Sequence, residues 1–261
     1  MNILETIVAA KRIEVAVKKK QRPIDQLEKD PLFQRECLSL AAFLQNPDKT
    51  GIIAEFKRRS PSKGLINGTA RVEDVTKAYA GWGASAISVL TDEQFFGGTE
   101  ADLRAARFND VPLLRKDFII EPYQVYEAKA MGADVILLIA ACLKPEEVAE
   151  LAQLARQLGL SVLLELHDEE ELAHVSEFTP IVGINNRNLK TFKVDVEKSL
   201  EMASRLPADS LKVAESGIDK VEMIRLFKQN GFKGFLIGEQ FMKAEDPALA
   251  FEQFITELKN N

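Results

Sequence analysis

The sequence lacks most of the residue patterns that mark metal, redox or nucleotide sites. Its two cysteines, Cys37 and Cys142, are far apart and form no CxxC pair, so it predicts neither a disulfide framework nor a zinc site. Its two histidines, His167 and His174, belong to no HExxH or similar pattern. A P-loop, a GxGxxG fingerprint and a Ser-His-Asp signal are also absent. We therefore expect no metal site, and interpret His167 as a polar residue near the start of a helix.

Long apolar runs and an excess of positive charge are missing as well. No apolar run could span a membrane, and the N-terminus has no apolar signal-peptide core. The formal net charge is −6, from 34 Lys and Arg against 40 Asp and Glu, which is not the footprint of a nucleic-acid-binding protein. We expect a cytoplasmic protein that binds neither membrane nor nucleic acid. An anionic substrate would need positive charge gathered locally.

Strand and helix patterns alternate from residue 52 to the end of the chain. Apolar stretches predict eight buried strands, at 52–56, 86–90, 112–114, 135–140, 161–166, 181–184, 211–214 and 234–237. Helical patterns follow them, at 71–79, 100–107, 121–131, 145–158, 169–176, 196–205, 220–228 and 247–258. Continuous apolar strands indicate a parallel sheet covered on both faces. The pattern predicts an α/β fold, a (β/α)8 TIM barrel, with a doubly wound open sheet as the alternative.

We predict one domain over residues 1–261, of which 1–50 is an N-terminal helical extension. The length suits a single α/β barrel of roughly 200 to 250 residues with this addition. Apolar residues recur at helical spacing from Ile3 to Val17. A basic stretch begins at Lys11 and runs to Arg22. We interpret it as a solvent-exposed helix face.

Charged residues occupy strand positions where apolar ones are expected. In the first strand Ile53, Glu55 and Lys57 share one face, and burying a charge is costly unless it is paired or used. The same is true of other strand ends, which carry Lys116, Glu165, His167, Asn185, Arg187 and Glu215. Each of these residues alone also fits a structural or solvated role. In a barrel all of these strand ends meet at one mouth, which is where active sites lie.

Residue types at these ends suggest the chemistry. Adjacent lysines and glutamates give coupled acids and bases with shifted pKa values, and a desolvated lysine can act as a general acid. Ser216-Gly217 and Gly238-Glu239 follow the last two strands, where barrels commonly bind phosphate through main-chain N–H groups. Phe95, Phe96 and Phe118 could form an apolar wall for an aromatic ring, although core packing explains them equally well.

Eight stretches together resemble the indole-3-glycerol-phosphate synthase family across essentially the whole chain. They are Ile53-Ala54-Glu55-Phe56-Lys57 with Ser60-Pro61-Ser62-Lys63-Gly64, Ile87-Ser88-Val89-Leu90-Thr91-Asp92 with Phe96 and Gly98, Leu114-Arg115-Lys116-Asp117-Phe118, Gly132-Ala133-Asp134, Leu164-Glu165-Leu166-His167, Gly183-Ile184-Asn185-Asn186-Arg187-Asn188-Leu189, Ala214-Glu215-Ser216-Gly217-Ile218 and Leu236-Ile237-Gly238-Glu239. The resemblance implies ring closure, decarboxylation and dehydration of 1-(2-carboxyphenylamino)-1-deoxyribulose 5-phosphate. It implies no cofactor and no metal.

The resemblance also implies residue roles. Lys116 would protonate the alkoxide formed in ring closure, and Glu165 would assist as an acid or base. Lys57 would hold the substrate carboxylate. The remaining implied residues are Glu55, Asn185 and Glu215 as positioning groups, Ser60 and Arg187 in the same polar cluster, Ser216, Gly217, Gly238 and Glu239 at the phosphate, and Phe96, Phe118, Leu137 and Ile139 around the ring.

Two alternatives to this function stay open at this point. Another phosphosugar barrel, such as phosphoribosylanthranilate isomerase, usually carries a Cys or Asp on an early strand, whereas the first strand here carries Glu55 and Lys57. A catalytically dead barrel would have lost the charged residues at the mouth. The length excludes a fused two-enzyme chain, and we expect a monomer rather than an obligate oligomer. Some relatives have Ser where this chain has Glu239, which leaves the role of that side chain open.

Overall fold

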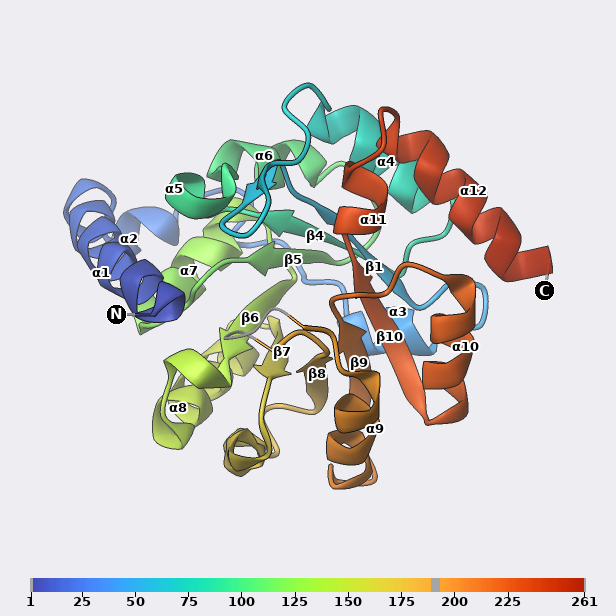
Figure 1. The fold of residues 1–261 in the computed structure, drawn as a ribbon. Helices are drawn as coiled ribbons and strands as arrows, with labels where there is room; N and C mark the ends of the chain where they lie inside the picture. The colour runs from blue at the N-terminus through green and yellow to red at the C-terminus, as the bar shows by residue number, and fades with distance from the viewer. Residues whose placement is uncertain (1, 189–192, 261) are drawn as a thin grey trace.

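The computed structural model describes residues 2–188 and 193–260, and its centre is a closed parallel barrel (Figure 1). The strands are β1 (Ile52–Phe56), β4 (Ala86–Leu90), β5 (Leu113–Lys116), β6 (Val135–Ile139), β7 (Ser161–Leu166), β8 (Ile181–Asn185), β9 (Leu211–Glu215) and β10 (Phe232–Ile237). The barrel closes at β1, where Ile53 is in register with Ala86 of β4 on one side and with Leu236 of β10 on the other. This closure confirms the predicted TIM barrel and rules out the open sheet.

Helices surround the barrel and follow the predicted order. They are α4 (Val72–Gly81), α6 (Glu100–Ala106), α7 (Pro122–Met131), α8 (Pro145–Gln157), α9 (Val196–Ser204), α10 (Val221–Gln229) and α12 (Pro247–Asn260). Short elements lie in the loops: β2 (Arg59–Ser60), β3 (Gly64–Leu65), α5 (Glu93–Phe96), η1 (Ala140–Cys142), η2 (Glu169–His174) and α11 (Glu239–Met242). Among the described residues, no helix combines the length and apolar character needed to cross a membrane.

One predicted helix has a different form. Residues 169–176 were expected to be α-helical, but the chain forms the 3₁₀ helix η2, which ends at His174. Beyond it, Thr179 bonds with Ser176 through both its side chain and its backbone, and this local turn competes with helical hydrogen bonds. The loop after β7 is therefore compact.

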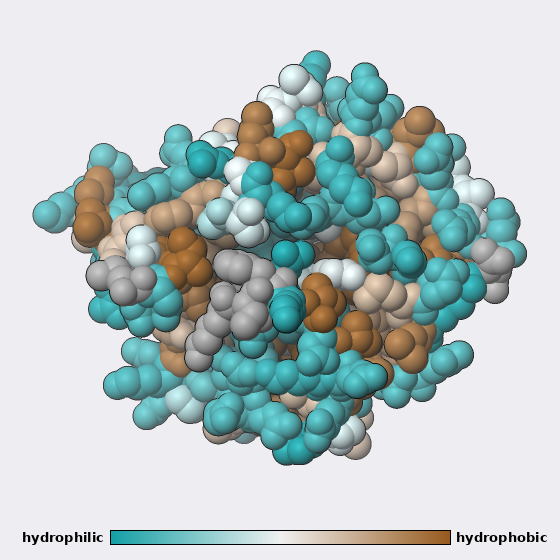
Figure 2. All heavy atoms as spheres, viewed as in Figure 1, coloured by the Kyte–Doolittle hydropathy of each residue, from teal (hydrophilic) through white to brown (hydrophobic). Residues whose placement is uncertain are grey.

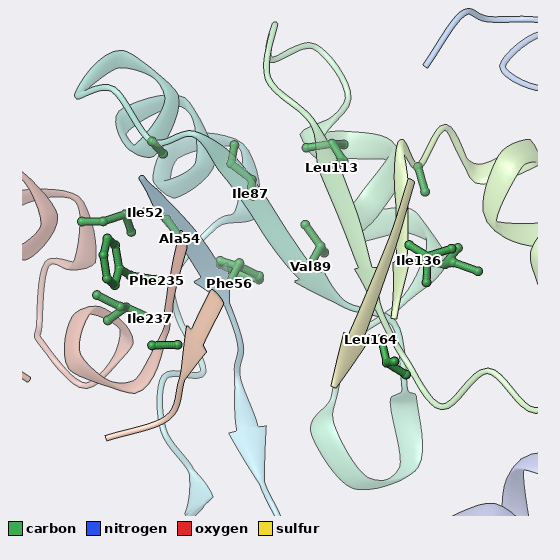
Figure 3. Close-up of a cluster of buried hydrophobic side chains, with 14 of the residues drawn as sticks. Ile52, Ala54, Phe56, Ile87, Val89, Leu113, Ile136, Leu164, Phe235 and Ile237 are labelled. Carbon is green, nitrogen blue, oxygen red and sulfur yellow. The ribbon is translucent and has the colours of Figure 1, made fainter. Parts of the chain in front are cut away.

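Alternating strand residues build two apolar layers. Ile52, Ala54 and Phe56 of β1 point outward into the cluster beneath the helices, part of which Figure 3 shows. Ile53 points inward, where it joins an inner cluster with Leu114 of β5 and other strand residues. On β1, β5, β7 and β9 the inward position near the carboxyl end carries a charged side chain, Glu55, Lys116, Glu165 or Glu215, so the alternation itself delivers these side chains to the mouth.

The N-terminal extension forms three helices that contact opposite ends of the barrel. They are α1 (Ile3–Gln21), α2 (Ile24–Leu27) and α3 (Leu40–Gln45). Leu40 and Leu44 of α3 pack into the inner cluster at the end where the strands begin, next to β4 and β10. Helix α1 lies instead against α7 and η1, near the mouth.

The interpretation of the basic stretch as wholly solvent-exposed is wrong at Lys11. Its side chain is 1% exposed, and its Nζ lies 3.0 Å from Asp92 Oδ2 and 2.9 Å from Asp117 Oδ1. The buried face of α1 follows Ile7, Lys11 and Val15, one residue per turn. Ile13 and Val17, which belong to the predicted apolar pattern, are 70% and 48% exposed.

Lys11 is part of a buried charge network that continues beneath α1. Arg115 Nη2 lies 3.0 Å from Asp117 Oδ2 and 2.6 Å from Glu127 Oε2, and both contacts are almost fully buried. Burial alone would lower the pKa of Lys11, but the carboxylates of Asp117 and Asp92 outweigh this effect and raise the pKa above its usual value. Lys11 therefore stays charged within the network. It ties the helical extension to the ends of β4 and β5.

The outer surface in the orientation of Figure 2 is mostly hydrophilic, and hydrophobic residues lie there in small separate groups. Scattered apolar side chains of this kind are normal on a monomeric protein.

We predict that Lys11→Met destabilises the protein by about 3–5 kcal/mol, because it leaves Asp92 and Asp117 buried without that partner. Lys19→Met on the same helix is the control: its side chain is 49% exposed and pairs with Glu121 at 2.8 Å. It should cost less than about 1 kcal/mol. Denaturant unfolding measures both. Equal losses would show that the network does not hold α1.

Candidate active site

The mouth of the barrel is hollowed into a cavity of about 540 Å³. All of the site residues that the family resemblance implied line it. They come from β1, β5, β6, β7, β8 and β9 and from the loops that follow the strands. The structure therefore brings together residues that are up to 184 positions apart, from Glu55 to Glu239.

Lys116 lies among carboxylates in this cavity. Its Nζ is 2.9 Å from Glu165 Oε2 and 3.6 Å from Glu215 Oε2. Asn185 Nδ2 donates to the other oxygen of Glu165, Oε1, at 2.8 Å. On the first strand, Lys57 Nζ donates to Glu55 Oε1 at 2.6 Å. Lys116 thus pairs with Glu165 and lies near Glu215, and Lys57 pairs with Glu55.

Burial and charge shift the pKa values of this cluster in different directions. Desolvation lowers the pKa of Lys116, the effect that the sequence argument used, but Glu165, Glu215 and Glu55 together raise it above its usual value. Burial raises the pKa of Glu165, but Lys116 and His167 hold it well below its usual range. Burial and the charge of Glu165 raise the pKa of Glu215 to about 8. At neutral pH, Lys116 and Glu215 therefore carry protons and Glu165 does not.

The predicted phosphate loops follow β9 and β10 and line the same cavity. Ser216 and Gly217 both have left-handed backbone, with φ of 66° and 70°, and Asn186 Nδ2 donates to the Ser216 carbonyl at 2.8 Å. Successive left-handed residues aim main-chain N–H groups into a concave surface that suits an anion. Gly238 allows close packing, because a Cβ there would lie 2.6 Å from Glu55 Oε1.

The Glu239 carboxylate reaches across this end of the cavity. Its Oε1 lies 3.6 Å from Lys63 Nζ, and its Oε2 lies 3.6 Å from Arg187 Nη2. Its side chain is therefore directed at cations contributed by two other loops.

Apolar side chains form the wall beside Lys116. The rings of Phe96 and Phe118 are 6.0 Å apart and tilted by 38°. Leu137 and Ile139 of β6 continue the wall. Phe95, which the sequence also suggested, packs against the inner cluster and does not line the cavity.

The cavity also contains residues to which the sequence analysis assigned no role in the site. His167 lines it, with Nε2 2.9 Å from Glu165 Oε1. Its position on the same strand face as Glu165 was a usable signal. Ile3, Leu4 and Ile7 of α1 also line the cavity, and no sequence signal predicted this because helix docking depends on tertiary packing.

A closed parallel barrel with lysines and carboxylates gathered at the carboxyl ends of its strands is a TIM-barrel enzyme. Solved structures with the same fold include tryptophan synthase subunit alpha from Legionella pneumophila str. Paris, with TM-score 0.62 and 14% identity, covering 85% of this chain and 97% of that one. Another is 3-hexulose-6-phosphate synthase from Salmonella typhimurium, with TM-score 0.64 and 11% identity, covering 81% of this chain and 99% of that one. Such distant likeness shows the fold alone.

Sequence comparison is more specific. The sequence model of indole-3-glycerol phosphate synthase matches residues 4–254. The indole-3-glycerol phosphate synthase of Bacteroides thetaiotaomicron is 50% identical over 97% of this chain and 98% of its own length. Those of Polaromonas sp. (strain JS666) and Bordetella pertussis are 43% and 41% identical, over 97% of this chain and 97% and 99% of their own lengths. The chain belongs to the indole-3-glycerol phosphate synthase family, carboxy-lyases of tryptophan biosynthesis.

Family membership confirms the resemblance drawn from the motifs and excludes the other phosphosugar barrel considered above. One motif residue, Leu189, lies outside the described residues.

We predict that Gly183→Ala disturbs the site from β8. A Cβ at this position would overlap Glu215 Oε1, so the carboxylate beside Lys116 must move. We expect a loss of about 1–3 kcal/mol in stability and a lower kcat. Gly81→Ala is the control, since nothing lies within 4 Å of its Cβ in α4. It should stabilise by roughly 0.5–1 kcal/mol. Unchanged stability and kcat in Gly183→Ala would contradict this geometry.

Proposed function

We propose that this cavity carries out the reaction of the family on 1-(2-carboxyphenylamino)-1-deoxyribulose 5-phosphate. The ring carbon that bears the carboxylate attacks the ketone carbon, carbon dioxide leaves, and loss of water gives indole-3-glycerol phosphate. The observation that carries the proposal is that Lys116, placed against Glu165 and Glu215, shares one cavity with an apolar wall and with the loops proposed to bind phosphate. The arrangement matches a substrate that is aromatic at one end and anionic at the other.

Lys116 is proposed as the general acid for ring closure. The attack breaks the aromaticity of the ring and turns the ketone oxygen into an alkoxide, so a nearby proton donor lowers the barrier. Lys116 carries a proton at neutral pH, and its positive charge also stabilises the developing negative charge. Glu215, protonated at neutral pH, lies 3.6 Å behind it as a positioning group.

Glu165 is proposed to accept and return protons during closure and dehydration. It is ionised at neutral pH, which a base requires, and it contacts Lys116 directly. Lys57 is proposed to hold the substrate carboxylate until carbon dioxide leaves, while Glu55 fixes the lysine at 2.6 Å. Asn185 orients Glu165, and Ser60 and Arg187 complete the polar side of the cavity.

The substrate is proposed to lie with its ring against the apolar wall and its phosphate across the mouth. Phe96, Phe118, Leu137 and Ile139 provide the surface for the ring. Ser216, Gly217, Gly238 and Glu239 offer backbone N–H groups to the phosphate. Glu239 contributes its main chain there, because its carboxylate is directed at Lys63 and Arg187.

We propose further that the enzyme acts as a monomer in the cytoplasm, as one barrel domain of residues 1–261 with a helical extension at 1–50. The charged and apolar groups that the proposed reaction requires all lie in this one cavity. Cys37 and Cys142 are free thiols, as is usual in a reducing compartment.

We predict that Lys116→Ala lowers kcat by roughly 10² to 10⁴ with the fold intact, because the proton donor is lost. Lys116→Arg should not restore activity, since the planar, forked guanidinium cannot place a donor where the compact ammonium of lysine does. The fluorescence of the indole product reports turnover. Lys144→Ala, at an exposed helix start away from the cavity, should behave like wild type. Full activity in a folded Lys116→Ala protein would reject the proposed acid.

We predict that Gly217→Ala weakens phosphate binding, because a side chain at its φ of 70° is strained and its Cβ would lie 2.6 Å from Val194 Cγ2. Substrate KM should rise by about tenfold, equivalent to ~1.4 kcal/mol. Competitive inhibition by inorganic phosphate should weaken in parallel. Gly68→Ala, with only an ordinary contact at 3.5 Å, is the control.

A different result would locate the anion elsewhere. If Lys20→Ala, in the basic stretch of α1, weakens phosphate inhibition while Gly217→Ala does not, the proposed orientation of the substrate is reversed.

A further inference from the structure

His167 is a buried ionisable group at the active site that the proposed reaction leaves without a role. It follows the end of β7, and its side chain is 4% exposed. Its Nε2 lies 2.9 Å from Glu165 Oε1, and its Nδ1 lies 3.6 Å from Glu171 Oε2 on η2. The imidazole is therefore held between two carboxylates, one inside the cavity and one behind it.

We propose that His167 is a positioning residue for this reaction, which holds the Glu165 carboxylate so that Oε2 faces Lys116. The inference rests on the proposed role of Glu165 as the acid and base of the site. His167 itself is not proposed to exchange protons with the substrate.

The contacts of Glu165 are divided between its two oxygens. Oε2 contacts Lys116 at 2.9 Å. Oε1 contacts Asn185 Nδ2 at 2.8 Å and His167 Nε2 at 2.9 Å. Fixing both oxygens sets the rotation of the carboxylate, and a base must point at the proton it takes. Without His167, Asn185 alone would hold the side of Glu165 that faces away from Lys116.

Glu171 in turn fixes His167. Its Oε2 accepts a hydrogen bond from the His167 backbone N–H at 2.6 Å and lies close to the ring nitrogen Nδ1. Glu171 can do this because it is the third residue of η2, and its carboxylate turns back to the start of that helix as in a capping box.

Charge favours the same arrangement. Burial lowers the pKa of His167, but its contacts with Glu165 and Glu171 outweigh this and raise the pKa to about 10. The ionisable groups near these carboxylates include Lys116, Glu215, Asp168 and the Cys142 thiol of η1, whose pKa burial raises to about 12. His167 also lines a second cavity together with Lys193, Asp195 and Lys198. The imidazolium of His167 helps to keep Glu165 ionised at neutral pH. Lys116 is the first group that lowers the pKa of Glu165, and His167 is the second.

The test compares His167→Gln and His167→Asn with His174→Gln. His174 is seven residues further along, and its ring contacts only the carbonyls of Glu171 and Leu143. We expect the His167 variants to lose about 10- to 100-fold in kcat, as when an orienting partner is removed elsewhere. KM should stay close to wild type, because the ring does not bind substrate. His174→Gln should keep the wild-type kcat.

The pH profile adds a readout that a purely structural role would not move. Removing the imidazolium raises the pKa of Glu165, so the acid limb of kcat should move to higher pH by about one unit. Ring ¹⁵N resonances in the His174→Gln protein isolate His167 directly. They should show an imidazolium at neutral pH that titrates near 10.

The outcomes separate this inference from the proposed function. If Glu165→Gln keeps full turnover, the role proposed for Glu165 is wrong. If Glu165→Gln is inactive but the His167 variants keep wild-type kcat and pH profile, only the role of His167 is overturned. If neither His167 variant folds, the ¹⁵N titration decides, and a ring that is neutral at pH 7 overturns the inference.

Discussion

The pairing of buried charges at the carboxyl ends of the strands is the constraint on which the rest of the structure depends. A buried ion is stable only when opposite charges and hydrogen bonds surround it. Lys116 meets this requirement with Glu165 and Glu215 inside the mouth. Lys11 meets it with Asp92 and Asp117 just outside. Because Lys116 and Asp117 are consecutive, β5 connects the two clusters, and helix docking and active-site geometry share one short segment.

Much of this could be predicted from sequence, because strands obey a period of two. The face shared by Glu55 and Lys57, and the face shared by Glu165 and His167, follow from alternation alone. Barrel closure then brings the strand ends together whatever the loops do. The placement of Glu55, Lys116, Asn185 and Glu215 in one cavity is thus a consequence of local pattern and a known topology.

The parts that sequence did not predict depend on packing between elements. A helix can present any of its faces to a barrel, and the charges of α1 suggested that they face solvent. The buried face of α1 nevertheless includes Lys11, because the carboxylates of Asp92 and Asp117 lie at the ends of β4 and β5. The direction in which the pKa of Lys116 shifts could not be predicted from sequence for the same reason. Burial and three neighbouring carboxylates act in opposite directions, and only their distances decide which is stronger.

The position of helix α3 also determines how substrate can enter the barrel and how products can leave it. Leu40 and Leu44 close the end where the strands begin, and the inner cluster fills the space between them and the cavity. In the part of the chain that the structure describes, the barrel is thus open at the mouth and filled at its other end. In the proposed reaction the carbon dioxide, the water and the indole product must all depart by the opening through which the substrate came in. Carbon dioxide and water must pass the larger reaction intermediate, which is still bound when they leave. A molecule that blocks the mouth would therefore stop both the entry of substrate and the release of products.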